Sequence, residues 1–194
     1  MPRIVQTRLA YDGYAKVSVL TLEEEGGERH QREVVSFGQS ACVLPYDPER
    51  RVALIVRLPR APLLADRIVG NLIEAPAGMI GPDETAEAAI RREAMEEAGV
   101  RLGDLEPVAV CWPSPGVLAE RTHLFLAAYR ATDRVGAGGG LAEEHEGISV
   151  DEIPLADLER AANAGDLRDL KTLTLVLALR LRRHELFAPR PREA

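Results

Sequence analysis

The stretch GMIGPDETAEAAIRREAMEEAGV, residues 78–100, carries most of the information in this chain. Its segment 85–98 is rich in Ala, Glu, Arg and Met, with Pro82 and Asp83 ahead of it and Gly99 after it. These residue types favour a helix, and the flanking residues are start and stop signals, so the sequence predicts a helix here. The notable positions of the stretch are Gly78, Glu84, Arg92, Glu93, Glu96, Glu97 and Gly99.

Three carboxylates of this predicted helix share one face. At about 100° per residue, Glu93, Glu96 and Glu97 stand at positions i, i+3 and i+4, within one turn. Their repulsion costs about 0.2–0.5 kcal/mol per pair in a bare helix, and a divalent cation among the oxygens reverses this cost. The alternative is a solvated acidic face, which has no use for Gly78 and Gly99 at fixed distances outside the helix. The pattern therefore favours a metal site.

All seven positions resemble the Nudix box, the signature of hydrolases that cleave a nucleoside diphosphate linked to another group. The resemblance implies Mg²⁺ as cofactor, with Mn²⁺ as an alternative ion, and such hard cations prefer oxygen ligands. The implied metal ligands are Glu93 and Glu97 in first place, then Glu96, the carbonyl of Ala77, and Glu146 from a later loop.

The remaining positions of the box are implied to be structural: Gly78, Glu84, Arg92 and Gly99. Arg92 would hold the carboxylates by ion pairing, because a guanidinium can bind several of them at once. Glu84 would belong to the helix start, where a negative charge is favourable.

Residues 138–148 resemble the late catalytic loop of the family, with glycines followed by acidic side chains. The resemblance implies Glu144 as the base that deprotonates or orients the attacking water, with Glu146 as second candidate and Glu97 as a further catalytic residue. The glycine-rich run 136–140 predicts a mobile hinge, which lets a loop carboxylate arrive only when substrate is bound. From the residues alone, a solvated loop is the alternative.

Short alternating or β-branched stretches between Gly, Pro and Asp predict strands along most of the chain. The predicted strands are 3–10, 15–22, 32–36, 40–45, 52–57, 105–112, 122–131 and 147–153, and the further predicted helices are 155–164 and 170–183. This order indicates an α/β (α+β) domain. The resemblance implies a Nudix fold, with a mixed β-sheet layered between helices. We expect an N-terminal β arm over 1–38, the hydrolase domain over 39–187 and a flexible tail over 188–194.

Blocks outside the box resemble the Nudix subfamily that hydrolyses nucleoside diphosphate sugars. They are Arg32-Glu33-Val34, Glu74-Ala75-Pro76-Ala77-Gly78, Ser114-Pro115-Gly116 and Asp169-Leu170-Lys171-Thr172. The resemblance implies ADP-ribose as first substrate. GDP-mannose is a close second, because the last block is nearer to the GDP-mannose type. The products would be a nucleoside monophosphate and a sugar phosphate.

The resemblance also implies substrate-binding residues: Arg60, Pro115, Gly116 and Glu120. Arg60 aligns with a family arginine, but Leu58-Pro59 stands where the family has a glutamine and an aromatic residue, which leaves the base preference open. Pro115 and Gly116 would shape the loop that holds the distal sugar, with an ordinary turn as the alternative. Glu120 is a binding or catalytic acid in this interpretation, and a surface charge in the other.

The composition suits a compact intracellular enzyme. The chain has 194 residues, of which 46% are hydrophobic, and a net charge of −7, which argues against non-specific binding of nucleic acid. Cys42 and Cys111 lack disulfide or zinc-site spacing, which indicates a reducing cytoplasm. No apolar run reaches the roughly 20 residues that span a bilayer.

The resemblance implies a homodimer with exchanged N-terminal strands and composite active sites. Two other classes of function remain open at this point. Some proteins of this fold are non-catalytic sensors of nucleotide sugars, and other enzymes with the box act on diadenosine polyphosphates, coenzyme A or capped RNA. The intact carboxylates disfavour a sensor, and the acidic charge disfavours RNA.

Overall fold

The structure, a computed structural model, describes residues 1–68, 70–141 and 147–188. The chain forms two compact units, one of Met1–Gln39 with Cys111–Thr122 and one of Ser40–Val110 with His123–Ala194. The first unit therefore contains the predicted arm and also a second segment, Cys111–Thr122, that the sequence had not assigned to it. Within the described ranges, no helix is long and apolar enough to cross a membrane.

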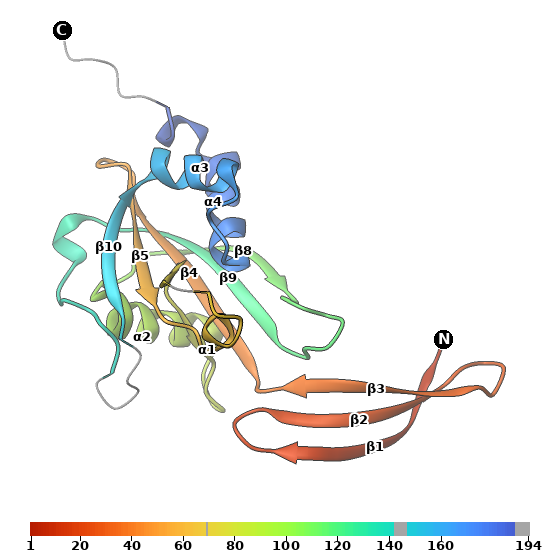
Figure 1. The fold of residues 1–194 in the computed structure, drawn as a ribbon. Coiled ribbons are helices and arrows are strands. Elements are labelled where there is room, and N and C mark those ends of the chain that lie inside the picture. The colour runs from red at the N-terminus through yellow and green to blue at the C-terminus, as the bar shows by residue number, and fades with distance from the viewer. Residues whose placement is uncertain (69, 142–146, 189–194) are drawn as a thin grey trace, which may run out of the picture. The chain divides into compact units, whose positions relative to one another are not determined.

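The first unit is a three-stranded antiparallel sheet in the order β1 (Arg3–Asp12), β2 (Lys16–Glu23) and β3 (Arg29–Ser36) (Figure 1). Val35 of β3 donates its N–H to Val117 O and accepts from Ala119 N, both at 2.9 Å, so the second segment runs along β3. On β1, Ile4, Leu9 and Tyr11 are more than half exposed. Exposed apolar side chains on such a strand are typical of an interaction surface.

The second unit is built on a sheet with strand order β10-β5-β4-β9-β8, in which β6 joins β5 and β7 joins β4. Its strands are β4 (Gln39–Asp47), β5 (Val52–Leu58), β6 (Leu72–Glu74), β7 (Ala77–Met79), β8 (Leu105–Cys111), β9 (Arg121–Ala128) and β10 (Ser149–Pro154). Its helices are α1 (Ala61–Ala65), α2 (Ala86–Ala98), α3 (Leu155–Ala164) and α4 (Leu170–Arg182), with short 3₁₀ turns η1 (Ala131–Asp133) and η3 (His184–Leu186).

The segment between β6 and β7 is fixed between two strands of this sheet. Glu74 of β6 faces Val56 of β5, and Ala77 of β7 faces Cys42 of β4. Between them, Pro76 accepts a hydrogen bond from Val43 N at 3.0 Å through its carbonyl oxygen. The backbone that leads into α2 is therefore held by sheet hydrogen bonds on both sides.

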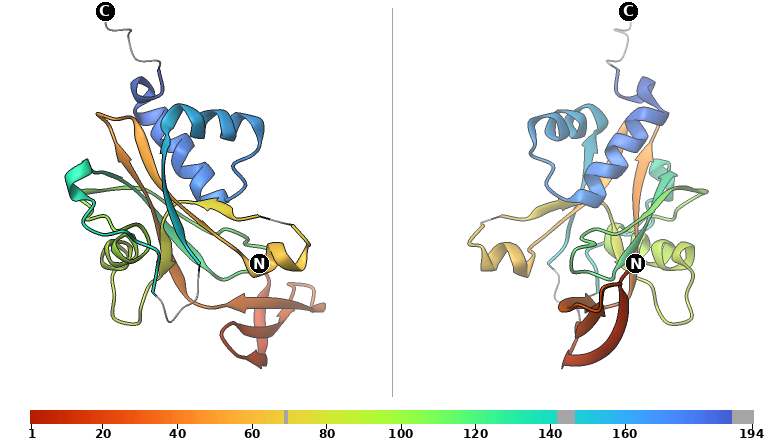
Figure 2. Two further views of the ribbon diagram at one scale, coloured as in Figure 1. Left: turned by 60° about the vertical axis from the view of Figure 1, so that its left-hand side comes forward. Right: turned by 90° about the vertical axis from the view of Figure 1, so that its right-hand side faces the viewer.

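Helices lie on both faces of the sheet (Figure 2). On one face, Val43 and Leu54 belong to the same buried cluster as Ile90 of α2. Because side chains alternate along a strand, the buried neighbours Leu44 and Ile55 point to the other face, where α3 and α4 lie. Burial of each such side chain contributes about 1.5–3 kcal/mol to the free energy of folding. The predicted α+β fold, with a sheet layered between helices, is confirmed.

The element boundaries follow local signals. Thr85 caps the N-terminus of α2 by accepting a hydrogen bond from Ala88 N at 3.2 Å, and Gly99 ends the helix in the left-handed region with φ of 64°. The predicted strands agree with the observed ones to within a few residues. Helix α1 was not predicted, because five residues are too few for a periodic apolar pattern.

Candidate active site

Arg92 gathers carboxylates along α2. Its Nη1 atom donates to Glu93 Oε1 at 2.8 Å and to Glu96 Oε2 at 3.1 Å. Its Nε and Nη2 atoms donate to the two oxygens of Glu84, both at 3.1 Å. The hydrogen bonds from Arg92, followed by one from Gly81 N, lower the pKa of Glu84. These contacts agree with the ion pairing expected of Arg92, and they tie the start of α2 to its middle.

Two carboxylates of α2 lie against strand β7. Glu97, which is only 4% exposed, accepts a hydrogen bond from Ala77 N through Oε2 at 2.9 Å. Glu93 lies over Gly78, where an added Cβ would come within 2.0 Å of the Glu93 carboxyl carbon. A side chain at position 78 would therefore displace the carboxylate. This close approach gives a physical reason for the glycine in the motif.

The donor atoms at this place suit a hard divalent cation. They are carboxylate oxygens of α2 and the backbone of β7, and Mg²⁺ takes oxygen ligands at about 2.1 Å. Gly78 leaves the space that a carboxylate needs beside this backbone. Among the residues that the structure describes, no three Asp, Glu, His or Cys side chains are placed so that they could hold a metal ion. Glu93 and Glu96 contact Arg92 instead, so metal binding would require them to exchange this partner.

The glycine-rich run is bound to the C-terminal end of α2. Gly139 N donates to Glu97 O at 2.9 Å, and Gly140 N donates to Glu96 O at 3.0 Å. Gly138, with φ of 71°, comes so close that an added Cβ would lie 2.3 Å from Glu97 O. These bonds satisfy carbonyls that a helix end leaves without helical partners. Residues 138–140 thus form part of the helix cap, and the mobile hinge expected over 136–140 stays a prediction.

Gly99 takes part in the same close approach. Its carbonyl oxygen accepts hydrogen bonds from Val135 N at 2.9 Å and Gly136 N at 3.1 Å, and an added Cβ would lie 2.2 Å from Gly136 O. The backbone of the helix end is therefore in direct contact with the backbone of the glycine-rich run. The predicted loop acids Glu144 and Glu146 lie outside the described residues, so their roles stay predictions.

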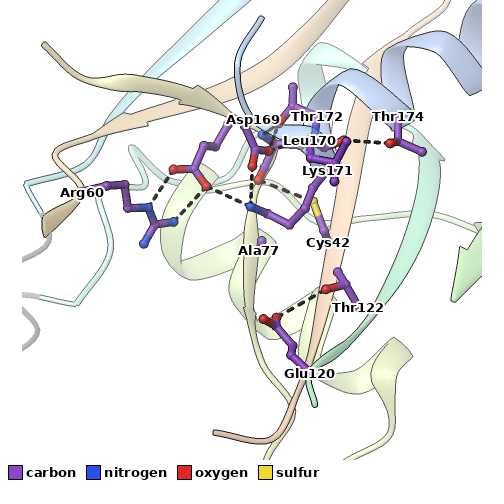
Figure 3. Close-up of polar contacts among 12 residues, drawn as sticks. Cys42, Arg60, Ala77, Glu120, Thr122, Asp169, Leu170, Lys171, Thr172 and Thr174 are labelled. Atoms are coloured by element: carbon purple, nitrogen blue, oxygen red, sulfur yellow. Dashed lines mark hydrogen bonds and ion pairs between the residues drawn. The ribbon is translucent and has the colours of Figure 1, made fainter. Parts of the chain in front are cut away.

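A second group of polar side chains lies at the N-terminus of α4 (Figure 3). Its charged members are joined by ion pairs and are called the Glu74 cluster: Arg60, Glu74, Asp169 and Lys171. Glu74, which is 2% exposed, accepts two hydrogen bonds from Arg60, at 2.7 Å from Nε and 3.0 Å from Nη2. Lys171 Nζ lies 2.6 Å from Asp169 Oδ1 and 3.3 Å from Glu74 Oε2. Burial acts to lower the pKa of Lys171, but the charges of Asp169 and Glu74 raise it above the ordinary value. Two cations thus compensate two buried carboxylates.

The other predicted binding residues belong to the first unit and are Pro115, Gly116 and Glu120. Val117 N donates to Ser114 O at 3.1 Å, which closes a turn around residues 115 and 116. Glu120 accepts a hydrogen bond from Thr122 Oγ1 at 3.3 Å (Figure 3). Both arrangements are local to this unit, and the substrate roles of the three residues stay predictions.

The first unit also contains a cavity of about 490 Å³. It is lined by Arg8, Val19, Gln31, Arg32, Glu33, Gly116 and Val117. Arg32 and Gly116 come from two of the sequence blocks that carried the subfamily resemblance. The fold therefore brings these distant blocks to one cavity.

Comparison with protein families gives a match to the NUDIX domain over residues 36–173, well over half of the chain. The chain belongs to the NUDIX domain family. The predicted family is therefore confirmed, and residues 78–100, which resemble the Nudix box, lie within the matched range.

Relatives of this Nudix chain are close in length to it. GDP-mannose pyrophosphatase from Cronobacter sakazakii is 36% identical over 187 residues, which cover 92% of this chain and 95% of that protein. GDP-mannose pyrophosphatase from Escherichia coli O1:K1 / APEC is 34% identical over 183 residues, covering 92% and 94%. A crystal structure of an ADP compounds hydrolase has a TM-score of 0.75 at 17% identity, covering 95% of both chains, and it supports the Nudix fold.

Sequence reasoning on this Nudix chain did not predict the contacts of the Glu74 cluster. The blocks 74–78 and 169–172 had been noted as similar to the family, but no contact between them was expected. Glu74 and Lys171 are 97 positions apart, and only the fold brings them together. A signal was present in the polarity of Glu74, since a carboxylate at the end of an apolar strand requires a buried partner.

Proposed function

We propose that this Nudix chain is a Mg²⁺-dependent pyrophosphatase that hydrolyses a nucleoside diphosphate sugar, with GDP-mannose as first candidate and ADP-ribose as second. The observation that carries the proposal is the seating of Glu93 and Glu97 against Ala77 and Gly78. The names of relatives at 34–36% identity support the activity class, and they are our reason for placing GDP-mannose before ADP-ribose.

In this proposal, the ligands of the ion are Glu93, Glu96, Glu97, the carbonyl of Ala77, and Glu146. When bound, the metal neutralises phosphate charge and polarises phosphorus. Glu97 is held in place by Ala77 N, and Arg92 holds Glu93 and Glu96 on one side of α2.

The proposed base is Glu144, with Glu146 as the alternative. It takes a proton from the attacking water, whose oxygen bonds to one phosphorus of the anhydride. The bond from that phosphorus to the bridging oxygen breaks, and the bridging oxygen leaves with the other phosphate. One water is thus consumed, and a nucleoside monophosphate and a sugar phosphate are formed.

We keep Pro115, Gly116 and Glu120 as proposed substrate-binding residues, and Arg60 as a weaker candidate. Arg60 binds Glu74 through two atoms, which gives it a structural use in the absence of substrate. The cavity lined by Arg32 and Gly116 supports a substrate role for the turn at 115 and 116, because arginine is a common partner of phosphate.

We also propose a homodimer that forms through the N-terminal arm. The exposed apolar side chains of β1, which are Ile4, Leu9 and Tyr11, support this proposal. Light scattering after gel filtration should give a mass near twice the 21.2 kDa of one chain. A mass of one chain at micromolar concentration would overturn the dimer.

The cytoplasm is the proposed compartment. Cys42 and Cys111 are both free thiols, and Cys42 is buried, which raises the pKa of its thiol and keeps it unreactive. Such unpaired cysteines suit a reducing environment.

The deciding experiment is a substrate panel with purified protein and Mg²⁺. We would measure kcat/KM for GDP-mannose, ADP-ribose, UDP-glucose, a diadenosine polyphosphate and coenzyme A, and identify the products. The expected result is preference for GDP-mannose, with release of GMP and a sugar phosphate. No turnover of any compound, together with tight binding of one nucleotide sugar, would show that the protein is a sensor and not an enzyme. Preference for coenzyme A or a dinucleotide would overturn the substrate class.

A further inference from the structure

Thr172, at the start of α4 (Figure 3), binds the backbone of Ala75 between β6 and β7. The residue is fully buried. Its Oγ1 atom accepts a hydrogen bond from Ala75 N at 2.7 Å and donates one to Asp169 Oδ2 at 2.6 Å. The same Asp169 oxygen accepts from Thr172 N at 2.9 Å, as the cap of α4. The hydroxyl is thus used as donor and acceptor at once, which fixes its direction.

The bond to Ala75 acts close to the proposed metal ligands. Ala75 stands two residues before Ala77, whose N–H donates to Glu97 Oε2 at 2.9 Å. Pro76 lies between them, and its ring restricts φ and so stiffens the connection. The turn is therefore held at Ala75 by α4 and at Ala77 by α2, from the two faces of the sheet. Ala75 and Ala77 are thus connected through one residue with restricted φ.

We propose that Thr172, oriented by Asp169, is a positioning residue that sets the place of Ala77 relative to Glu97 and thereby the metal affinity of the site. The proposal rests on the proposed function. Its physical reason is that Ala75 N is fully buried, so without Thr172 Oγ1 the backbone must move to find another acceptor. Replacing a residue that supports a metal ligand through hydrogen bonds typically lowers metal affinity or activity by about 10–100-fold.

The test compares three substitutions. Thr172→Val removes the hydroxyl and keeps the shape, and Thr172→Ser keeps the hydroxyl. Thr174→Val is the matched control, because Thr174 Oγ1 donates to Leu170 O within the same helix and does not reach β6 or β7. For each protein we would measure the Mn²⁺ dissociation constant by electron paramagnetic resonance without substrate, kcat and KM with saturating Mg²⁺, and the melting temperature.

The expected result is a Mn²⁺ dissociation constant raised about tenfold or more by Thr172→Val, with kcat lowered more than KM is changed. Thr172→Ser should lie within about threefold of wild type, since the hydrogen bonds remain. Thr174→Val should bind Mn²⁺ as wild type does.

Unchanged Mn²⁺ binding in folded Thr172→Val would overturn the proposal. An equal rise of the Mn²⁺ dissociation constant in Thr172→Ser would also overturn it. If Thr172→Val does not fold, Thr172→Ala removes the same oxygen without the second branch of valine and takes its place. Failure of both to fold would assign Thr172 to stability alone. The proposed function fails separately, if wild type binds Mn²⁺ but hydrolyses none of the panel. A wild type that binds no Mn²⁺ would overturn both.

Discussion

The carboxylates of α2 and those of the Glu74 cluster are both close to the β6–β7 segment, but they are compensated differently. At α2, one guanidinium, that of Arg92, contacts three carboxylates. In the Glu74 cluster, the two cations Arg60 and Lys171 contact two carboxylates. The second group is also more deeply buried, with Glu74 only 2% exposed.

This difference in charge balance agrees with the proposed metal site at α2 and with a structural role of the Glu74 cluster. Buried carboxylates are tolerated when each has a cation and hydrogen bonds, as in the Glu74 cluster. Several carboxylates around one arginine instead favour the arrival of further positive charge, which a divalent cation provides. The sequence pattern predicted metal ligands on α2 but no partners for Glu74, and the structure supplies those partners as Arg60 and Lys171.

The largest expected effect comes from Glu97→Gln. It removes charge from the proposed metal site but keeps an amide oxygen that can accept from Ala77 N, so the fold should survive. We expect kcat/KM to fall by at least about 10²-fold. Glu87→Gln is the control, because Glu87 is exposed on the first turn of the same helix. Near-normal turnover by a folded Glu97→Gln protein would show that the α2 carboxylates do not form the metal site.

Gly78→Ala should have a smaller effect. The new methyl group would meet the Glu93 carboxyl group, which must swing away from β7, while the helix itself can stay in place. We expect kcat to fall by about tenfold, with little change in melting temperature. Gly26→Ala is the matched control, since an added Cβ there meets nothing within 4 Å. Equal kinetics for the two variants would show that Glu93 does not need its place over Gly78.

The smallest effect on activity is expected from Arg60→Met, which tests the Glu74 cluster. Loss of two hydrogen bonds leaves Glu74 with Lys171, and the free energy of unfolding should fall by about 1–3 kcal/mol in urea titrations. Arg160→Met is the control, because its ion pair with Asp157 is exposed and worth about 0–1 kcal/mol. A raised KM with unchanged stability would instead assign Arg60 to substrate binding.

The fold was largely predictable because its signals are local. Helix α2 was predicted from its composition, from Pro82 and Asp83 ahead of it and from Gly99 after it, and the strands were predicted from alternation and turn residues. The ion pairs of Arg92 also follow from helical spacing and from the resemblance. In contrast, the backbone bonds from Gly139 and Gly140 to the end of α2 were not predicted, because glycine composition indicates freedom and does not show where a backbone docks.

The sequence by itself determined the family, because the motif depends on spacing along one segment, and the α+β fold, because its helices and strands have local signals. Only the tertiary structure decided which cations lie beside Glu74. It placed Glu74 beside Lys171, and Thr172 beside Ala75, across 97 positions in each case. The physical reason is that charge compensation and the burial of an amide depend on distances in space, and residues far apart in the chain acquire those distances only when the sheet and its helices pack.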